Sequence, residues 1–154
     1  MTDNKINILY VDDEVNNLTS FKAMFRVKYN VFTAISADDA MKIMETQPIE
    51  IIVTDQRMPN MTGVEFLEKV LEKYPEPMRI LLTGYADMNA VIDAVNKGKI
   101  FHYLSKPWNE EELDGTIQRA YDVYKQAQEM KNLSEKLIVS NDQLEFLLRQ
   151  KLLS

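Results

Sequence analysis

Five short apolar segments alternate with segments of helical periodicity over the first two thirds of this sequence. This alternation restricts the possible folds more than any other feature. The apolar segments are residues 6–11, 31–34, 49–54, 79–83 and 100–104. They are rich in β-branched residues and nearly continuous, which is typical of parallel strands covered on both faces. Between them, apolar residues recur at the spacing of helices that bury one side. The sequence therefore predicts five strands, each followed by a helix.

The ends of the predicted helices are also marked. Pairs that resemble capping boxes precede three of them: Ser36 with Asp39, Thr62 with Glu65, and Asn109 with Glu112. We expect Pro75 and Pro77 to end the third helix and Gly98 to end the fourth. Right-handed crossovers leave few arrangements of a (βα)5 chain. We predict a doubly wound, flavodoxin-like α/β fold with a five-stranded parallel sheet in the order 2-1-3-4-5.

Composition excludes several functional classes. The chain has 154 residues, of which 45% are hydrophobic, so a globular domain is expected. The net charge of -6 argues against a surface that binds nucleic acid directly. Cysteine is absent, which excludes disulfides and thiolate metal sites. The polar N-terminus shows no signal peptide, and no apolar run approaches the ~20 residues of a membrane span. We expect a soluble, cytoplasmic protein without a membrane partner.

The last third of the chain has a different pattern. Residues 109–154 lack proline, contain only one glycine, Gly115, and show no strand signal. Two columns recur every seven residues: Val123, Met130, Leu137 and Leu144, and Ala120, Ala127, Ser134, Asn141 and Leu148. This pattern predicts a parallel or antiparallel coiled-coil seam, in which Asn141 is a candidate for fixing the register, although Ser134 and Lys151 weaken it. The alternative is an ordinary fifth helix with a frayed tail. We assign residues 1–125 to the α/β domain and residues 126–154 to a coiled-coil or linker helix that continues from the fifth helix.

Carboxylates occur where two of the predicted strands end. Asp12 and Asp13 follow the first apolar segment, and Asp55 follows the third. Open α/β sheets bind their ligands at the carboxyl ends of the strands, in the crevice where the strand order reverses. Carboxylates that meet there repel one another by roughly 4 kcal/mol per close pair, and a divalent cation relieves this repulsion. Of the other carboxylates, Asp87 is expected to cap a helix and Asp93 to face solvent.

Taken with residues farther along the chain, these carboxylates resemble a known family. Tyr-Val-Asp-Asp-Glu follows the first strand at residues 10–14, and Asp-x-x-Met-Pro-x-x-x-Gly follows the third at residues 55–63. Thr-Gly-Tyr at residues 83–85 and Lys-Pro at residues 106–107 follow the fourth and fifth strands. Residues 5 to 125 resemble the receiver domain of two-component response regulators, and the predicted coiled coil lies outside the resemblance.

The resemblance implies a role for each of these residues. Asp55 would be the nucleophile that accepts a phosphoryl group. Mg²⁺ would be held by Asp13 and Asp55, by Asp12 mainly through water, and by the backbone carbonyl of Arg57. Lys106 would pair with one phosphoryl oxygen, and the Thr83 hydroxyl would donate to another. We also expect a cis bond between Lys106 and Pro107, which would direct the lysine inward.

The resemblance also implies a switch and a set of partners. Thr83 would move toward the phosphoryl group, and Tyr103 would rotate inward behind it. The altered surface would be the fourth helix, the fifth strand and the fifth helix. The phosphoryl donor would be a sensor histidine kinase or a histidine phosphotransfer protein. A homodimer is expected through this surface, through the C-terminal coil, or through both. Arg57 and Tyr85 are expected to tune dephosphorylation, and His102 is expected to be a surface residue rather than a phosphate carrier.

Two other functional classes are alternatives to this switch. A phosphatase resembling haloacid dehalogenases needs an Asp-x-Asp motif on the first strand and a cap segment, and this sequence contains neither. A coiled-coil interaction module with a passive receiver would keep the same oligomeric state whether or not Asp55 is modified. We therefore expect a non-enzymatic signalling domain that catalyses only its own phosphorylation and dephosphorylation. We further hypothesise that a downstream effector domain is absent from this chain, which would be the N-terminal part of a longer regulator.

Overall fold

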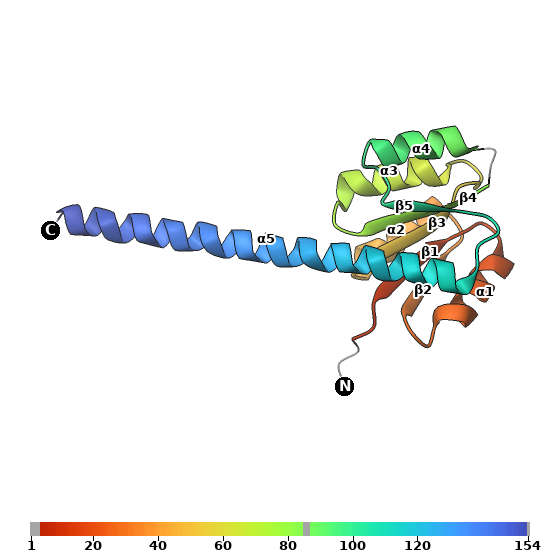
Figure 1. Cartoon of the computed structure of the whole chain (residues 1–154), viewed down its shortest axis with the longest axis horizontal. Helices are drawn as coiled ribbons and strands as arrows, with labels where there is room; N and C mark the ends of the chain where they lie inside the picture. The colour runs from red at the N-terminus through yellow and green to blue at the C-terminus, as the bar shows by residue number, and fades with distance from the viewer. Residues whose placement is uncertain (1–3, 85–86, 154) are drawn as a thin grey trace. The chain divides into compact units, whose positions relative to one another are not determined.

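The computed structural model describes residues 4–84 and 87–153 and contains the predicted parallel sheet (Figure 1). The strands are β1 (Asn7–Val11), β2 (Asn30–Ala34), β3 (Ile51–Asp55), β4 (Met78–Thr83) and β5 (His102–Ser105). They pair in the order β2-β1-β3-β4-β5, and every pair is parallel. The predicted fold and strand order are confirmed, and the strand ends differ from the predicted ones by at most two residues.

Within the described residues, five helices connect and follow the strands. They are α1 (Val15–Phe25), α2 (Ala37–Thr46), α3 (Gly63–Lys73), α4 (Met88–Asn96) and α5 (Glu110–Leu153). The hydrophobic core has two parts because both faces of the sheet are covered. One part joins one face of the sheet to α2, α3 and α4, and the other joins the opposite face to α1 and the first turns of α5. The central strands β1 and β3 are therefore buried on both sides, and their ends are open for a functional site.

The predicted helix ends are present in the structure. The Ser36 hydroxyl accepts a hydrogen bond from the backbone N–H of Asp39, and Thr62 and Glu65 form a complete capping box. Asn109 Oδ1 accepts from the backbone N–H of Glu112 at 2.7 Å. Helix α3 ends before the two prolines, and Gly98, with a φ of 73°, follows α4. These side chains satisfy backbone groups that helix ends would otherwise leave unpaired.

Strand register decides which side chains meet at the open edge. In the parallel pair β1–β3, Val11 is the partner of Thr54. The next residue on each strand is Asp12 and Asp55, so these two carboxylates reach the same end of adjacent strands. The chain connections of β1 and β3 leave toward opposite sides of the sheet, since β1 lies between β2 and β3. This is the crevice in which doubly wound sheets bind ligands.

The chain forms two compact units, and helix α5 contributes to both. The boundary between the units lies between Tyr121 and Asp122. In the first unit, Leu113, Ile117 and Ala120 are buried in the core. The burial of Ala120 corrects the predicted seven-residue column that began there, because a side chain packed in the domain core is not available to a coiled-coil seam. The predicted seam can begin only at Val123.

A polar network ties the first turns of α5 to the loop before β2. The Tyr29 hydroxyl donates to Asp114 and accepts from the Gln118 side chain at 2.7 Å. Lys28 forms an ion pair with Asp114 at 2.6 Å. Although partial burial of the Asp114 carboxyl acts to raise its pKa, the hydrogen bonds from Lys28 and Tyr29 lower that pKa below its ordinary value. The network therefore contributes stability above the ordinary carboxyl range, and that stability is lost as the pH falls through the lowered pKa.

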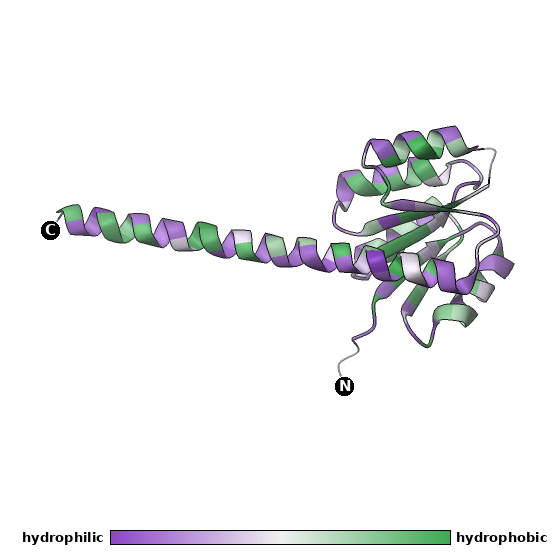
Figure 2. Ribbon diagram, viewed as in Figure 1, coloured by the Kyte–Doolittle hydropathy of each residue, from purple (hydrophilic) through white to green (hydrophobic). Residues whose placement is uncertain are grey.

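The second unit is the helical segment from Asp122 onward, and its apolar side chains are exposed. They include Val123, Met130, Leu137, Leu144 and Leu148. Figure 2 shows hydrophobic and hydrophilic residues interspersed along this part of α5. Within residues 4–84 and 87–153, no helix combines the length and the apolar character needed to cross a membrane.

Candidate functional site

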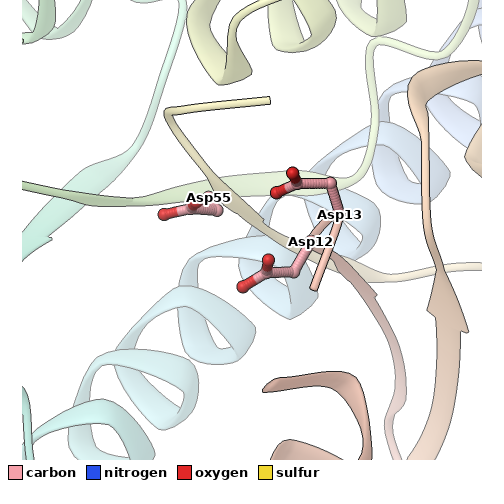
Figure 3. A group of neighbouring side chains, drawn as sticks. All are labelled: Asp12, Asp13 and Asp55. Atoms are coloured by element: carbon pink, nitrogen blue, oxygen red, sulfur yellow. The ribbon is translucent and has the colours of Figure 1, made fainter. Parts of the chain in front are cut away.

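Three carboxylates gather at the end of the sheet where β1 and β3 stop (Figure 3). Asp12, Asp13 and Asp55 each offer an oxygen, and these oxygens all lie within 4.8 Å of one another. Asp12 and Asp55 are only 1% and 6% exposed, whereas Asp13 is exposed. The predicted convergence of these residues is therefore present, and its negative charge is partly removed from water.

The Asp12 carboxylate is held by three donors from its own part of the chain. Oδ2 accepts from the Tyr10 hydroxyl at 2.8 Å and from the Asn17 side chain at 3.0 Å. Oδ1 accepts from the backbone N–H of Glu14 at 3.0 Å. Burial, with a smaller contribution from the hydrogen bond to Asp12, raises the pKa of Tyr10 far above its ordinary value. The phenol therefore stays protonated and acts as a donor.

Asp55 is paired with the lysine that follows β5. Lys106 Nζ lies 2.5 Å from Asp55 Oδ1. Burial raises the pKa of the Asp55 carboxyl, and the hydrogen bond and positive charge of Lys106 act in the opposite direction. The negative charge of Asp12 also acts to raise that pKa. Burial and the charge of Asp12 thus disfavour the ionised form of Asp55, and one cationic side chain, Lys106, favours it.

The loop after Asp55 folds back tightly on the strand. The backbone N–H of Gly63 donates to the carbonyl of Gln56 at 2.9 Å, and the buried Gln56 side chain accepts from the backbone N–H of Val64 at 2.9 Å. A Cβ on Gly63 would lie only 2.4 Å from the Asp55 carbonyl oxygen. The glycine is therefore needed for close approach. The sequence did not predict that the Gln56 side chain would accept a hydrogen bond from the start of α3, because a glutamine after a strand does not indicate which backbone group it will bind.

Thr83 and Lys106 follow neighbouring strands. Thr83 is buried, and its hydroxyl donates to the carbonyl of Gly84 at 3.0 Å. The backbone N–H of Lys106 donates to the Thr83 carbonyl at 2.8 Å, and the predicted cis bond between Lys106 and Pro107 is confirmed. Tyr103 is half-buried against the core part formed with α2, α3 and α4. Its partner on β4 is Leu81, two residues before Thr83, so Tyr103 and Thr83 point to the same face of the sheet.

Arg57 lies in the loop after β3 and is exposed. Its Nε is 3.2 Å from Asp87 Oδ2. Asp87 occupies the N-cap position of α4, but its side chain makes no capping bond, which corrects the expected role of that side chain as a cap. The carboxylate is turned to Arg57 instead. Tyr85, expected to act with Arg57, lies outside the described residues, and His102 is exposed as expected.

The chemistry of this donor set fits a hard divalent cation. Mg²⁺ prefers oxygen ligands and retains several waters, so a few carboxylates around an open position suit it. The residues available to hold the ion are Asp12, Asp13 and Asp55. Lys106 Nζ contacts the Asp55 carboxylate and supplies a positive charge for an anion bound next to the metal. The site can therefore place a cation and an anionic group next to the Asp55 carboxylate.

Comparison with known proteins yields one family. The family model for the response regulator receiver domain matches residues 8–118. Hydrogenase transcriptional regulatory protein HoxA from Cupriavidus necator is 36% identical over 154 residues, which is 100% of this chain and 32% of that protein. The chain thus spans about a third of the length of this curated relative, and about a quarter of the length of others that match.

Solved structures show the same similarity. The structure titled adenylate cyclase from Rhodopirellula baltica has a TM-score of 0.83 and 29% identity, covering 86% of this chain and 98% of that chain. A response regulator receiver domain protein from Clostridium thermocellum has a TM-score of 0.75 and 30% identity, covering 79% of this chain and 98% of that one. In both cases the compared chain is matched almost entirely.

Proposed function

Because this chain belongs to the family of response regulator receiver domains, we propose that it is a phosphorylation-dependent switch that accepts a phosphoryl group on Asp55. The observation that carries this proposal is the contact between Asp55 and Lys106 beside Asp12 and Asp13. One carboxylate there has a cationic partner and two anionic neighbours. The arrangement suits a nucleophile that works next to a metal ion.

We propose that Mg²⁺ is held by Asp13 and Asp55, by Asp12 mainly through water, and by the backbone carbonyl of Arg57. When bound, the ion would offset the repulsion between Asp55 and an incoming phosphoryl group and stabilise the charge of the transition state. The three carboxylate oxygens within 4.8 Å of one another support this assignment.

The proposed reaction is a transfer from a phosphorylated histidine of a partner protein. A carboxylate oxygen of Asp55 forms a bond to phosphorus while the nitrogen–phosphorus bond breaks, and the bonding electron pair leaves with the imidazole nitrogen. Lys106 Nζ moves from Asp55 Oδ1 to a phosphoryl oxygen, because the carboxylate loses its negative charge in the acyl phosphate. The donor would be a sensor histidine kinase or a histidine phosphotransfer protein. The chain itself would catalyse only the gain and loss of its own phosphoryl group.

The proposed response begins at Thr83. Its hydroxyl, which now donates to its neighbour's carbonyl, would turn to donate to a phosphoryl oxygen, since phosphorylation adds about 1.5 to 2 negative charges and strong acceptors. Movement of Thr83 would make room for Tyr103 on the same face of the sheet. The surface formed by α4, β5 and the first turns of α5 would then change. A coupling free energy of ~1–3 kcal/mol between the two sites is enough for a useful shift of populations.

We propose further that the output passes through the C-terminal helix to another part of a longer regulator. The chain spans about a third of HoxA, a relative named as a hydrogenase transcriptional regulatory protein, and this share supports the proposal. A homodimer through the α4-β5-α5 surface, through a coil formed by residues 126–154, or through both would relay the change. The seven-residue spacing of exposed Met130, Leu137 and Leu144 supports the coil.

Light scattering on matched variants tests the coil. Leu137→Glu places a charge in the predicted seam and should shift dimers toward monomers. Val139→Glu places the same charge on an equally exposed residue outside the seam and should not. Equal oligomeric states for the two variants would rule out this seam.

Binding of beryllofluoride tests the proposed phosphoryl site without a kinase. The wild-type chain should show bound fluoride resonances by ¹⁹F nuclear magnetic resonance only when Mg²⁺ is present. Asp55→Asn should show none, while Asp93→Asn, a change on the exposed side of α4, should behave as wild type. Equal binding by wild type and Asp55→Asn would contradict the proposal.

A further inference from the structure

Tyr10 contributes a polar group to the site from inside the domain. It lies on β1, is 3% exposed, and stacks on Phe21 of α1 with ring centroids 4.1 Å apart and planes 9° apart. A phenylalanine could fill the same space and make the same stack. The hydroxyl is the only addition that tyrosine makes, and it donates to Asp12 Oδ2 at 2.8 Å.

Three hydrogen bonds use most of the acceptor capacity of Asp12. An ionised carboxylate has about four lone-pair positions, two on each oxygen. Tyr10 and Asn17 both donate to Oδ2, and the backbone N–H of Glu14 donates to Oδ1. Among the described residues, one position on Oδ1 is left without a donor. Asp12 therefore presents one oxygen, in one orientation, to the cluster with Asp13 and Asp55.

A carboxylate held in this way loses little freedom when a cation binds. A free aspartate must give up side-chain entropy to face a metal, and here the hydrogen bonds have already fixed the side chain. Donors behind a metal-binding carboxylate orient it, and changing such a donor typically weakens metal binding by about 10- to 100-fold.

We propose that Tyr10 is a positioning residue that orients Asp12 for Mg²⁺, with Asn17 as a second support for the same oxygen. This inference rests on the proposed function, because it takes the acidic cluster to be the metal site. Tyr10 itself does not contact the reacting groups. Its effect on the site passes entirely through Asp12.

Calorimetric titration with Mg²⁺ tests the role of Tyr10 without any phosphoryl transfer. Tyr10→Phe keeps the ring and removes the hydroxyl, and it should bind Mg²⁺ about tenfold more weakly than wild type. Tyr29→Phe is the matched control. It also removes a buried hydroxyl that donates to a carboxylate, but that carboxylate is Asp114, outside the acidic cluster. Tyr29→Phe should bind Mg²⁺ as wild type does, even if both variants lose stability.

A double-mutant cycle separates positioning from a general structural effect. In an Asp12→Ala background, Tyr10→Phe should cause no further loss of Mg²⁺ affinity, because the group through which it acts is gone. If the single Tyr10→Phe variant binds Mg²⁺ as tightly as wild type or more tightly, the inference about Tyr10 is overturned and the proposed metal site is not affected. A full tenfold loss in the Asp12→Ala background would have the same result. Failure of the wild-type chain to bind Mg²⁺ would overturn both the inference and the proposed metal site.

Discussion

Lys106 Nζ lies 2.5 Å from Asp55 Oδ1, a contact that joins the ends of β5 and β3 across the intervening strand β4. The two residues are far apart in the sequence, and only the strand order brings them together. The contact pairs an anion that burial destabilises with a cation that remains accessible to solvent. Under the proposed function, this lysine exchanges one anionic partner for another when the phosphoryl group arrives.

Replacement of Lys106 should slow phosphorylation strongly. In Lys106→Ala the transferring phosphoryl group loses its cationic partner, and removal of one such electrostatic contact typically costs about 10²- to 10³-fold in rate. The rate is measured from the intact mass of the protein at successive times after addition of acetyl phosphate and Mg²⁺. Lys97→Ala is the control, since Lys97 pairs with Asp93 on the exposed side of α4. A Lys106→Ala rate within about threefold of that of Lys97→Ala would contradict the assigned role.

Gly63→Ala should destabilise the domain. The new Cβ would lie 2.4 Å from the carbonyl oxygen of Asp55 and 2.7 Å from a side-chain carbon of Leu81, so the backbone or the core must move. We expect a loss of about 1–3 kcal/mol in the free energy of unfolding, measured by urea denaturation. Gly84→Ala is matched to it, because a Cβ there meets nothing within 4 Å. Equal stability of the two variants would show that the loop relaxes without cost.

The raised pKa of Asp55 makes stability depend on pH in a definite direction. Between the ordinary carboxyl range and the raised value, the folded chain binds more protons at this group than the unfolded chain does. The contribution of Asp55 to the free energy of unfolding therefore falls as the pH rises through this interval. Asp55→Asn removes the titration. In the absence of divalent cations, the stability of Asp55→Asn relative to wild type should increase as the pH rises and then level off.

Urea denaturation of both proteins, from about pH 4 to about pH 8, measures this difference. The lowered pKa of Asp114 affects both proteins alike, so it cancels in the comparison. A stability advantage of Asp55→Asn that shrinks with rising pH would show that Lys106 outweighs burial at Asp55.

Arg57 should affect the lifetime of the phosphorylated state. Its exposed side chain, held by Asp87, lies two residues after the proposed phosphoacceptor. Removal of the side chain should open the site to hydrolytic water. We expect Arg57→Ala to lose its phosphoryl group about fivefold faster, the rate equivalent of about 1 kcal/mol. Lys42→Ala on α2 controls for the change in net charge. The double variant Arg57→Ala, Tyr85→Ala tests the predicted partnership, and unchanged half-lives would reject it.

The strand order could be predicted because nearly continuous apolar segments and right-handed crossovers leave few alternatives. The acidic cluster followed from that order, since strands β1 and β3 are neighbours and Asp12 and Asp55 end them. Contacts made by side chains were less accessible to sequence reasoning. The hydroxyls of Tyr10 and Tyr29 occupy positions where apolar packing alone would also explain an aromatic ring. Their carboxylate partners depend on rotamers and on helix placement, which no periodicity encodes.

Two corrections have the same origin. Ala120 fits the seven-residue column, but its side chain is buried in the core of the domain. Periodicity identifies an apolar face of a helix but does not tell which surface that face will contact. Asp87 fits a cap by type and position, but the guanidinium of Arg57 competes for its carboxylate. In both cases a tertiary contact outweighed a local preference.

Whether Asp55 accepts the phosphoryl group can be determined by peptide mapping with mass spectrometry after treatment with acetyl phosphate and Mg²⁺. The wild-type protein should gain one phosphoryl group, located on Asp55, that is absent when Mg²⁺ is chelated and absent from Asp55→Asn. A folded wild-type protein that acquires no phosphoryl group, or acquires it on another residue, would show that Asp55 is not the phosphoacceptor.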